Sequence, residues 1–141
     1  MNSKRIGNIG EAAALMKFVE IGIPVYLPFG DNEKADLIAE LKGQLLKIQV
    51  KSSETYNGET TSFTTCSSRG STRDKVVYQE GEIDFFIFYC VKTKNLYMVH
   101  FSECPDNGIT IRHTPSKNNQ INKLRWHEDY IFNNVINNLL L

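Results

Sequence analysis

The sequence of 141 residues has no hydrophobic run long enough to cross a membrane, and its first residues lack the apolar stretch of a secretory signal peptide. We therefore predict a cytoplasmic protein. Neither sign of charge is in excess, because 16 Lys and Arg residues balance 16 Asp and Glu residues. Any contact with nucleic acid would depend on local clusters of positive charge. The cysteines, Cys66, Cys90 and Cys104, are odd in number and lack metal-finger spacing, which predicts free thiols.

No repeat, low-complexity tract or linker divides the chain, so we expect one domain over residues 1–141. Apolar spacing through Ile9, Ala12, Ala13, Met16 and Val19 predicts a helix over 11–20, which Gly22 and Pro24 would end. A second helix is predicted over about 125–141. Between the helices the pattern predicts strands at 24–29, 35–40, 45–51, 83–91, 96–101 and 109–112, the last completing one sheet.

The hairpin around Gly43 is the most informative segment of the chain. In its second strand Leu46, Ile48 and Val50 share one face, because side chains alternate along a strand. The opposite face carries Lys47, Gln49 and Lys51, and Asp36 stands at the start of the neighbouring strand. Oxygen ligands of this kind suit Mg²⁺, and an ammonium can hold a scissile phosphate. The alternative interpretation is an amphipathic strand with one face in water.

Glu11 falls in the first turn of the predicted helix, on the side that carries Leu15 and Phe18. That side is apolar, so the carboxylate is predicted to face protein, where a metal ligand would lie. The alternative explanation is that acids are favoured at helix N-termini by the helix dipole.

Four segments, 7–11, 35–38, 49–52 and 78–86, resemble the PD-(D/E)xK nuclease superfamily, and within it the bacterial group I intron homing endonucleases. The resemblance extends from about Lys4 into the final helix. It implies an α/β fold with a restriction-endonuclease-like core, in which a mixed central sheet is flanked by helices and an extended DNA-binding β-ribbon is added.

The resemblance also implies the roles of four residues. Asp36 and Glu11 would ligate Mg²⁺, for which Mn²⁺ would substitute, Gln49 would occupy the slot of the motif's second acid, and Lys51 would be the catalytic lysine. Two positions depart from the motif, since Gln49 removes a negative charge and Ala35 replaces the motif's proline. Some members of the superfamily carry Gln at this position.

A polar segment over about 53–75 is the predicted ribbon insertion. Asn57 and Gly58 signal a turn, and the Thr-rich run that follows has strand propensity with little to bury. A two-stranded ribbon of this kind would enter the DNA major groove, whereas the alternative is a solvated loop of Ser and Thr. The candidate DNA contacts are Lys47, Tyr56, Thr60, Ser62, Thr64, Arg69 and Arg73.

We therefore predict a site-specific, metal-dependent endonuclease of homing type that cuts double-stranded DNA at a long pseudo-palindromic site. One active site per chain implies a homo-oligomer, at least a dimer. The resemblance to related homing endonucleases implies a tetramer. The alternatives are a Holliday-junction resolvase or a restriction or repair nuclease of the same fold, and, from another class, a catalytically silent DNA-binding module.

Overall fold

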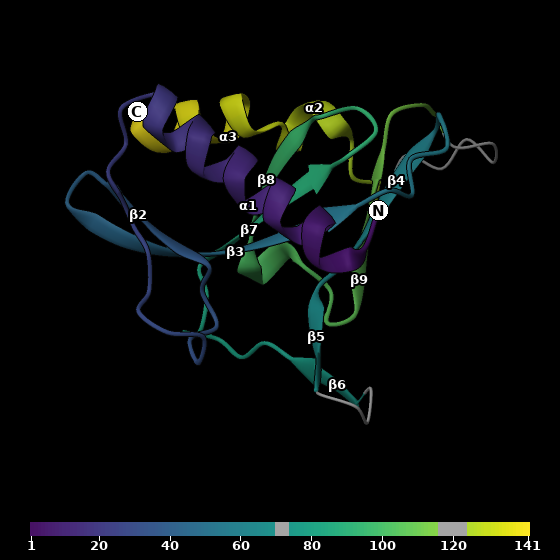
Figure 1. Ribbon diagram of the computed structural model, residues 1–141. Coiled ribbons are helices and arrows are strands. Elements are labelled where there is room, and N and C mark those ends of the chain that lie inside the picture. The colour runs from purple at the N-terminus through teal and green to yellow at the C-terminus, as the bar shows by residue number, and fades with distance from the viewer. Residues whose placement is uncertain (70–73, 116–123) are drawn as a thin grey trace.

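A mixed five-stranded sheet in the order β1-β2-β3-β7-β8 forms the centre of the computed structural model, which describes residues 1–69, 74–115 and 124–141 (Figure 1). β3 and β7 are parallel, and every other neighbouring pair is antiparallel. The α/β class and the mixed central sheet agree with the prediction. The five strands are β1 (Val25–Tyr26), β2 (Leu37–Leu41), β3 (Gln44–Ser53), β7 (Phe85–Cys90) and β8 (Leu96–His100).

The helices lie in one layer over one face of this sheet (Figure 1). They are α1 (Ser3–Glu20), α2 (His127–Tyr130) and α3 (Phe132–Leu140), and a short 3-10 helix, η2 (Phe101–Glu103), follows β8. Phe18 of α1 meets Phe132 of α3 edge to face, with ring centroids 5.1 Å apart. Both rings pack on Ile48 and Ile87 of the sheet, so this layer closes the first part of the hydrophobic core.

The opposite face of the sheet is covered by a two-stranded ribbon of β4 (Thr60–Thr64) and β9 (Gly108–Arg112). The ring of Phe63 in β4 lies 4.8 Å from the ring of Phe88 in β7, and Ile111 of β9 is buried beside them. All of β7 is buried because both of its faces are covered. The second part of the core therefore lies between β7, β8 and this ribbon.

A second ribbon, formed by β5 (Cys66–Arg69) and β6 (Asp74–Val77), projects away from the body of the molecule (Figure 1). Its base joins the core, where Cys66 pairs with Val77. The predicted ribbon insertion over 53–75 thus becomes two different ribbons. β4 does not pair with its neighbour in sequence, and β9 pairs with β4 instead of completing the central sheet.

The prediction that the Thr-rich run has little to bury was wrong. Thr61 is fully buried, and Phe63 is 4% exposed. Because side chains alternate along β4, the other three residues of the strand form its outer row: Thr60, Ser62 and Thr64.

Helix α1 begins at Ser3, eight residues before the predicted start at Glu11. Asn2 caps it, since its side-chain Oδ1 accepts a hydrogen bond of 2.9 Å from Arg5 N. Glu11 therefore lies in the middle of the helix and not in its first turn, which excludes the explanation by the helix dipole. The predicted end is confirmed, because the helix stops at Glu20 and Gly22 has φ +81°.

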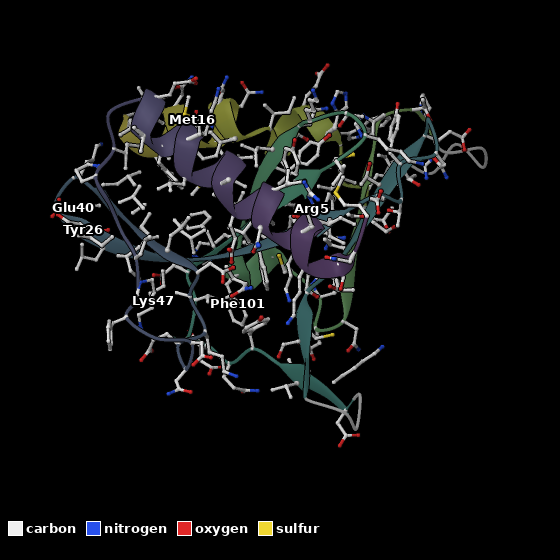
Figure 2. All side chains as sticks on the ribbon, viewed as in Figure 1. Arg5, Met16, Tyr26, Glu40, Lys47 and Phe101 are labelled. Atoms are coloured by element: carbon white, nitrogen blue, oxygen red, sulfur yellow. The ribbon has the colours of Figure 1, made fainter. Side chains whose placement is uncertain are left out.

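The side of α1 that carries Phe18 faces the protein, as predicted, but the apolar residues whose spacing predicted the helix do not coincide with its buried face. Met16 and Val19 are each 60% exposed, and Met16 lies on the outer side of the helix (Figure 2). The buried residues are Gly10, Ala14 and Phe18. Two of these are small, so the helix axis can approach the sheet closely on this side.

The C-terminal helix predicted over about 125–141 is broken at Ile131. This residue has an extended conformation, with φ −55° and ψ 132°, and forms a single β-bridge with Tyr97. Apolar spacing continues through the break, so the sequence pattern did not reveal it. The predicted strand over 24–29 is also shorter, since only Val25–Tyr26 pairs with β2.

The hairpin of β2 and β3 follows the prediction closely. Lys42 and Gly43 both have positive φ, 50° and 79°, as a two-residue type I′ turn requires. At the outer end of the hairpin Tyr26 Oη donates to Glu40 Oε2 at 3.4 Å, and the two side chains lie side by side (Figure 2). The three cysteines are free, as predicted. Within the described ranges no helix combines the length and apolarity needed to cross a membrane.

Candidate active site

Asp36 lies directly before β2 and is held to β3 from both its main chain and its side chain. Its N–H donates to Ile48 O at 2.7 Å, and its Oδ2 accepts a hydrogen bond of 2.9 Å from Val50 N. The pairing of Leu37 with Ile48 places Asp36 across from Gln49. The carboxylate is therefore fixed beside the polar face of β3, as the alternation predicted.

The carboxyl group of Glu11 reaches Asp36 from α1. The pKa of Glu11 is raised to about 7, mainly by burial and in addition by a hydrogen bond to Asp36 and by the charge of Asp36. The residue is exposed as a whole, but its carboxyl end is desolvated beside the second acid. Two carboxyl groups in contact repel each other when both are ionised, so Glu11 keeps its proton at a higher pH than an ordinary glutamate.

Gly10 makes this contact between α1 and β3 feasible. A Cβ at this position would overlap Ser52 Oγ and would lie 3.3 Å from Tyr89 Cβ. The helix can thus come close enough for Glu11, the next residue, to reach Asp36. The sequence carried a signal for this residue, because a glycine inside a helix is unfavourable by about 1 kcal/mol relative to alanine and usually has a packing reason.

Gln49 is half-buried on the same face of β3. Its Nε2 donates to Val50 O at 3.4 Å, a long hydrogen bond that restrains the amide only weakly. A neutral amide can orient water or coordinate a cation through its oxygen without adding charge.

Lys51 follows two residues later on the same face, and its ammonium is enclosed. Its Nζ donates to Cys66 O at 3.0 Å and lies 5.4 Å from the centroid of the Tyr78 ring. Burial lowers the pKa of Lys51, and the charges of Asp36 and Cys66 oppose that effect. Lys51 therefore interacts electrostatically with Asp36, which in turn contacts Glu11.

The structure thus brings Glu11, Asp36, Gln49 and Lys51 together from α1, the start of β2 and β3. Such a set offers two carboxylates and an amide oxygen, which are hard ligands suited to Mg²⁺ or Mn²⁺. In the part of the chain that is described, no three His, Cys, Asp or Glu side chains gather in one place. This is expected for the site described here, because its three candidate ligands are two acids and a glutamine.

Tyr78 also belongs to this site, although the sequence analysis did not single it out. Burial raises its pKa to about 12, and the charge of Asp36 acts in the same direction. Nothing in the local sequence signals its contact with Lys51, because the two residues meet only through the fold of β5 and β6.

The predicted DNA contacts divide into two groups. Ser62 and Thr64 are exposed on the outer row of β4, with Thr60 half-buried at its start, and Ser62 Oγ lies 3.0 Å from Thr110 Oγ1 of β9. Arg69 ends β5 on the projecting ribbon. These residues lie on the two ribbons, and their contact with DNA stays a prediction.

Two other predicted DNA contacts, Lys47 and Tyr56, interact with other residues of the chain, and the third is Arg73. Lys47 is exposed, but its Nζ donates to Gly81 O at 2.8 Å, so it supports the loop before β7. Tyr56 is half-buried against His113, with ring centroids 5.1 Å apart. Arg73 lies outside the described residues.

Comparison with known proteins agrees with this geometry. A sequence profile described as PD-(D/E)XK endonuclease matches residues 1–133. The chain belongs to the PD-(D/E)XK endonuclease family, and is a DNA endonuclease. Nucleases of this family typically use divalent metal ions and bind DNA.

A solved structure described as a bacterial homing endonuclease, I-Ssp6803I, is similar in fold. It superimposes with a TM-score of 0.75 at 24% sequence identity, covering 99% of this chain and 94% of that chain. The likeness confirms the restriction-endonuclease-like fold. A search among curated proteins found no match.

Proposed function

We propose that this endonuclease is magnesium-dependent and of homing type, and that it hydrolyses phosphodiester bonds in both strands of a long pseudo-palindromic DNA site. The observation that carries the proposal is the contact between the Glu11 and Asp36 carboxyl groups beside the ammonium of Lys51. The similarity of the fold to a homing endonuclease over nearly the whole chain supports the choice among nucleases.

Asp36 and Glu11 are the proposed ligands of Mg²⁺, with Mn²⁺ as a substitute. The raised pKa of Glu11 supports this choice, because burial and the neighbouring Asp36 both disfavour its charged form and a bound cation would offset that cost. When bound, the cation would polarise the scissile phosphate and lower the pKa of the attacking water.

The residues around the proposed cation orient its ligands and the attacking water, and stabilise charge on the phosphate. The hydrogen bond from Val50 N keeps Asp36 in one orientation, so that its carboxylate needs little reorganisation when it binds. Gln49 orients the attacking water or completes the ligand shell. Lys51 stabilises the negative charge that develops on the phosphate, and its partly desolvated position strengthens that interaction.

DNA recognition is assigned to the two ribbons. The hydroxyl row of Thr60, Ser62 and Thr64 offers donors and acceptors to base edges, and Arg69 offers a guanidinium to bases or phosphates. Lys47, Tyr56 and Arg73 complete the predicted contacts. Positive charge near the DNA is local here, since the net charge of the whole chain is zero.

The active assembly is proposed to be a homo-oligomer, at least a dimer and by family resemblance a tetramer. The described residues contain one Glu11–Asp36 pair, and cutting two strands at one site requires two. Exposed apolar side chains support an additional interface, because Met16 and Val19 are each 60% exposed and Phe29 is fully exposed.

The test is cleavage of a library of long random duplexes in Mg²⁺, with sequencing of the cut ends and Asp36→Asn protein as the blank. Asparagine keeps an oxygen that can accept from Val50 N, so the blank retains its local hydrogen bond. A long, degenerate, near-palindromic site cut only by the wild type is the expected result. A short strict site, a preference for four-way junctions over every linear duplex, or no cutting at all would each contradict the homing assignment.

A further inference from the structure

The ammonium of Lys51 lies at the base of the projecting ribbon, where it contacts one residue from each side of the ribbon. Cys66, whose carbonyl accepts from Lys51, is the first residue of β5. Tyr78, whose ring faces Lys51, directly follows the last residue of β6. Since Cys66 pairs with Val77, these two contacts stand next to each other where the ribbon joins the core.

Both contacts belong to firmly packed parts of the molecule. Tyr78 is 6% exposed, and its ring meets Phe86 of β7 edge to face at 5.6 Å. Its phenol also hydrogen-bonds with the side chain of Ser67 in β5, so Tyr78 joins the two strands of the ribbon. Cys66 is 8% exposed. The ribbon base is thus a rigid surface against which the flexible side chain of Lys51 packs.

A lysine carries its charge on a four-carbon stem with many rotamers, so a catalytic lysine needs partners that select one of them. The carbonyl of Cys66 supplies a directional acceptor, and the face of Tyr78 attracts the cation through its ring. Neither partner forms a salt bridge with Lys51. The ammonium is therefore oriented while its charge stays available to a phosphate.

We propose that Tyr78 is a positioning residue for Lys51, and that the base of the β5–β6 ribbon aims the lysine at the scissile phosphate. The inference rests on the proposed function, in which Lys51 stabilises the phosphate charge. The inference adds a second role for the ribbon that carries Arg69, because the ribbon then orients a catalytic residue as well as binding DNA. A change at the ribbon base then alters the rate of the chemical step more than the affinity for DNA.

Single-turnover cleavage of a duplex substrate by three variants tests this. Tyr78→Leu removes the ring face, whereas Tyr78→Phe keeps the ring and loses only the hydroxyl. Phe101→Leu is the matched control, because Phe101 is a half-buried ring of the same core that stacks on Phe86, whereas the Lys51 contacts described above involve Cys66 and Tyr78.

We expect Tyr78→Leu to lower the rate at saturating DNA about tenfold to a hundredfold, as for a misplaced catalytic group, with half-saturation within about threefold of the wild type. Tyr78→Phe, which keeps the ring face, should recover most of the rate that Tyr78→Leu loses, and Phe101→Leu should keep the wild-type rate within about threefold. A Tyr78→Leu rate equal to the wild-type rate, or an equal loss in Phe101→Leu, would overturn the proposal.

A second readout does not depend on cutting. An ammonium that is hydrogen-bonded and shielded from water gives a slowly exchanging ¹⁵N–¹H signal, which Lys51→Arg assigns by its loss. The signal should be present in the wild type and in Tyr78→Phe, and should be lost by exchange in Tyr78→Leu. Its absence from the wild type, or its persistence in Tyr78→Leu, overturns the positioning role. If the wild type cuts no DNA, the proposed function fails, while the signal still decides the positioning role.

Discussion

Replacing Glu11 by glutamine should make the metal-free protein more stable at alkaline pH. The folded protein holds the Glu11 carboxyl against Asp36 and partly away from water, which raises its pKa from the ordinary 4.5 to about 7. Between these values the folded state binds more protons than the unfolded state, so stability falls as the pH rises through this window. Glutamine resembles the protonated acid in shape and carries no charge, so it avoids that loss.

The size of the effect follows from the same pKa change. A shift from 4.5 to about 7 corresponds to at most about 3.4 kcal/mol, at about 1.4 kcal/mol for each tenfold change. Glu11 is partly exposed to water, which screens the interaction, so we expect about 1–2 kcal/mol at pH 8. At pH 5 the folded wild type has protonated Glu11, and only a few tenths of a kcal/mol, roughly a quarter of the gain, should remain.

Urea unfolding in EDTA at pH 5 and pH 8 measures both values. Glu20→Gln is the matched control, because Glu20 lies on the same helix and makes only a surface ion pair with Lys17 at 3.7 Å. That change should alter stability by less than about 1 kcal/mol at either pH. Equal stability of Glu11→Gln and the wild type at pH 8, or a gain of the same size at pH 5, would refute the contact between Glu11 and Asp36.

Three further results are expected from the same structure. Adding Mg²⁺ at pH 8 should raise the urea midpoint of the wild type in proportion to the logarithm of the Mg²⁺ concentration. The midpoint of Asp36→Asn should stay unchanged. A rise of equal size in both proteins would show that the ion binds elsewhere. Gly10→Ala should destabilise the fold by about 1–3 kcal/mol, because its methyl group would overlap Ser52 Oγ, and an unchanged midpoint in urea would show that α1 is not seated on β3 as described. Phe63→Ala should destabilise by about 3–5 kcal/mol, since the ring packs between Phe88 and Tyr97, whereas a solvated loop would lose less than about 1 kcal/mol.

The local pattern was sufficient for the hairpin that carries the site. Alternation along β3 separates Ile48 and Val50 from Gln49 and Lys51, and the turn at Gly43 fixes the register that places Asp36 across from Gln49. Both features depend only on neighbours in sequence. The placement of Asp36 beside Gln49 and Lys51 could therefore be predicted from the sequence, whereas the catalytic roles of these residues and of Glu11 rest on the family resemblance.

The parts that the sequence did not reveal depend on contacts between distant segments. Nothing in the Thr-rich run indicates that β4 pairs with β9, more than forty positions away, as in the pair Ser62 and Thr110. The same holds for Gly10 and Ala14 of α1, which are buried although the apolar spacing of the helix does not include them. Small residues at a tight interface leave no hydrophobic signal in the sequence.

The central claim is that Glu11 and Asp36 bind the cation of a nuclease, and that Lys51 stabilises the negative charge that develops on the scissile phosphate of the DNA. The most direct measurement is single-turnover cleavage of one bound duplex in Mg²⁺ by the wild type, Asp36→Asn and Lys51→Met, with DNA affinity measured in parallel. Both variants should bind DNA within about threefold of the wild type and cut it at least about a hundredfold more slowly. Cutting by either variant at the wild-type rate would contradict the account.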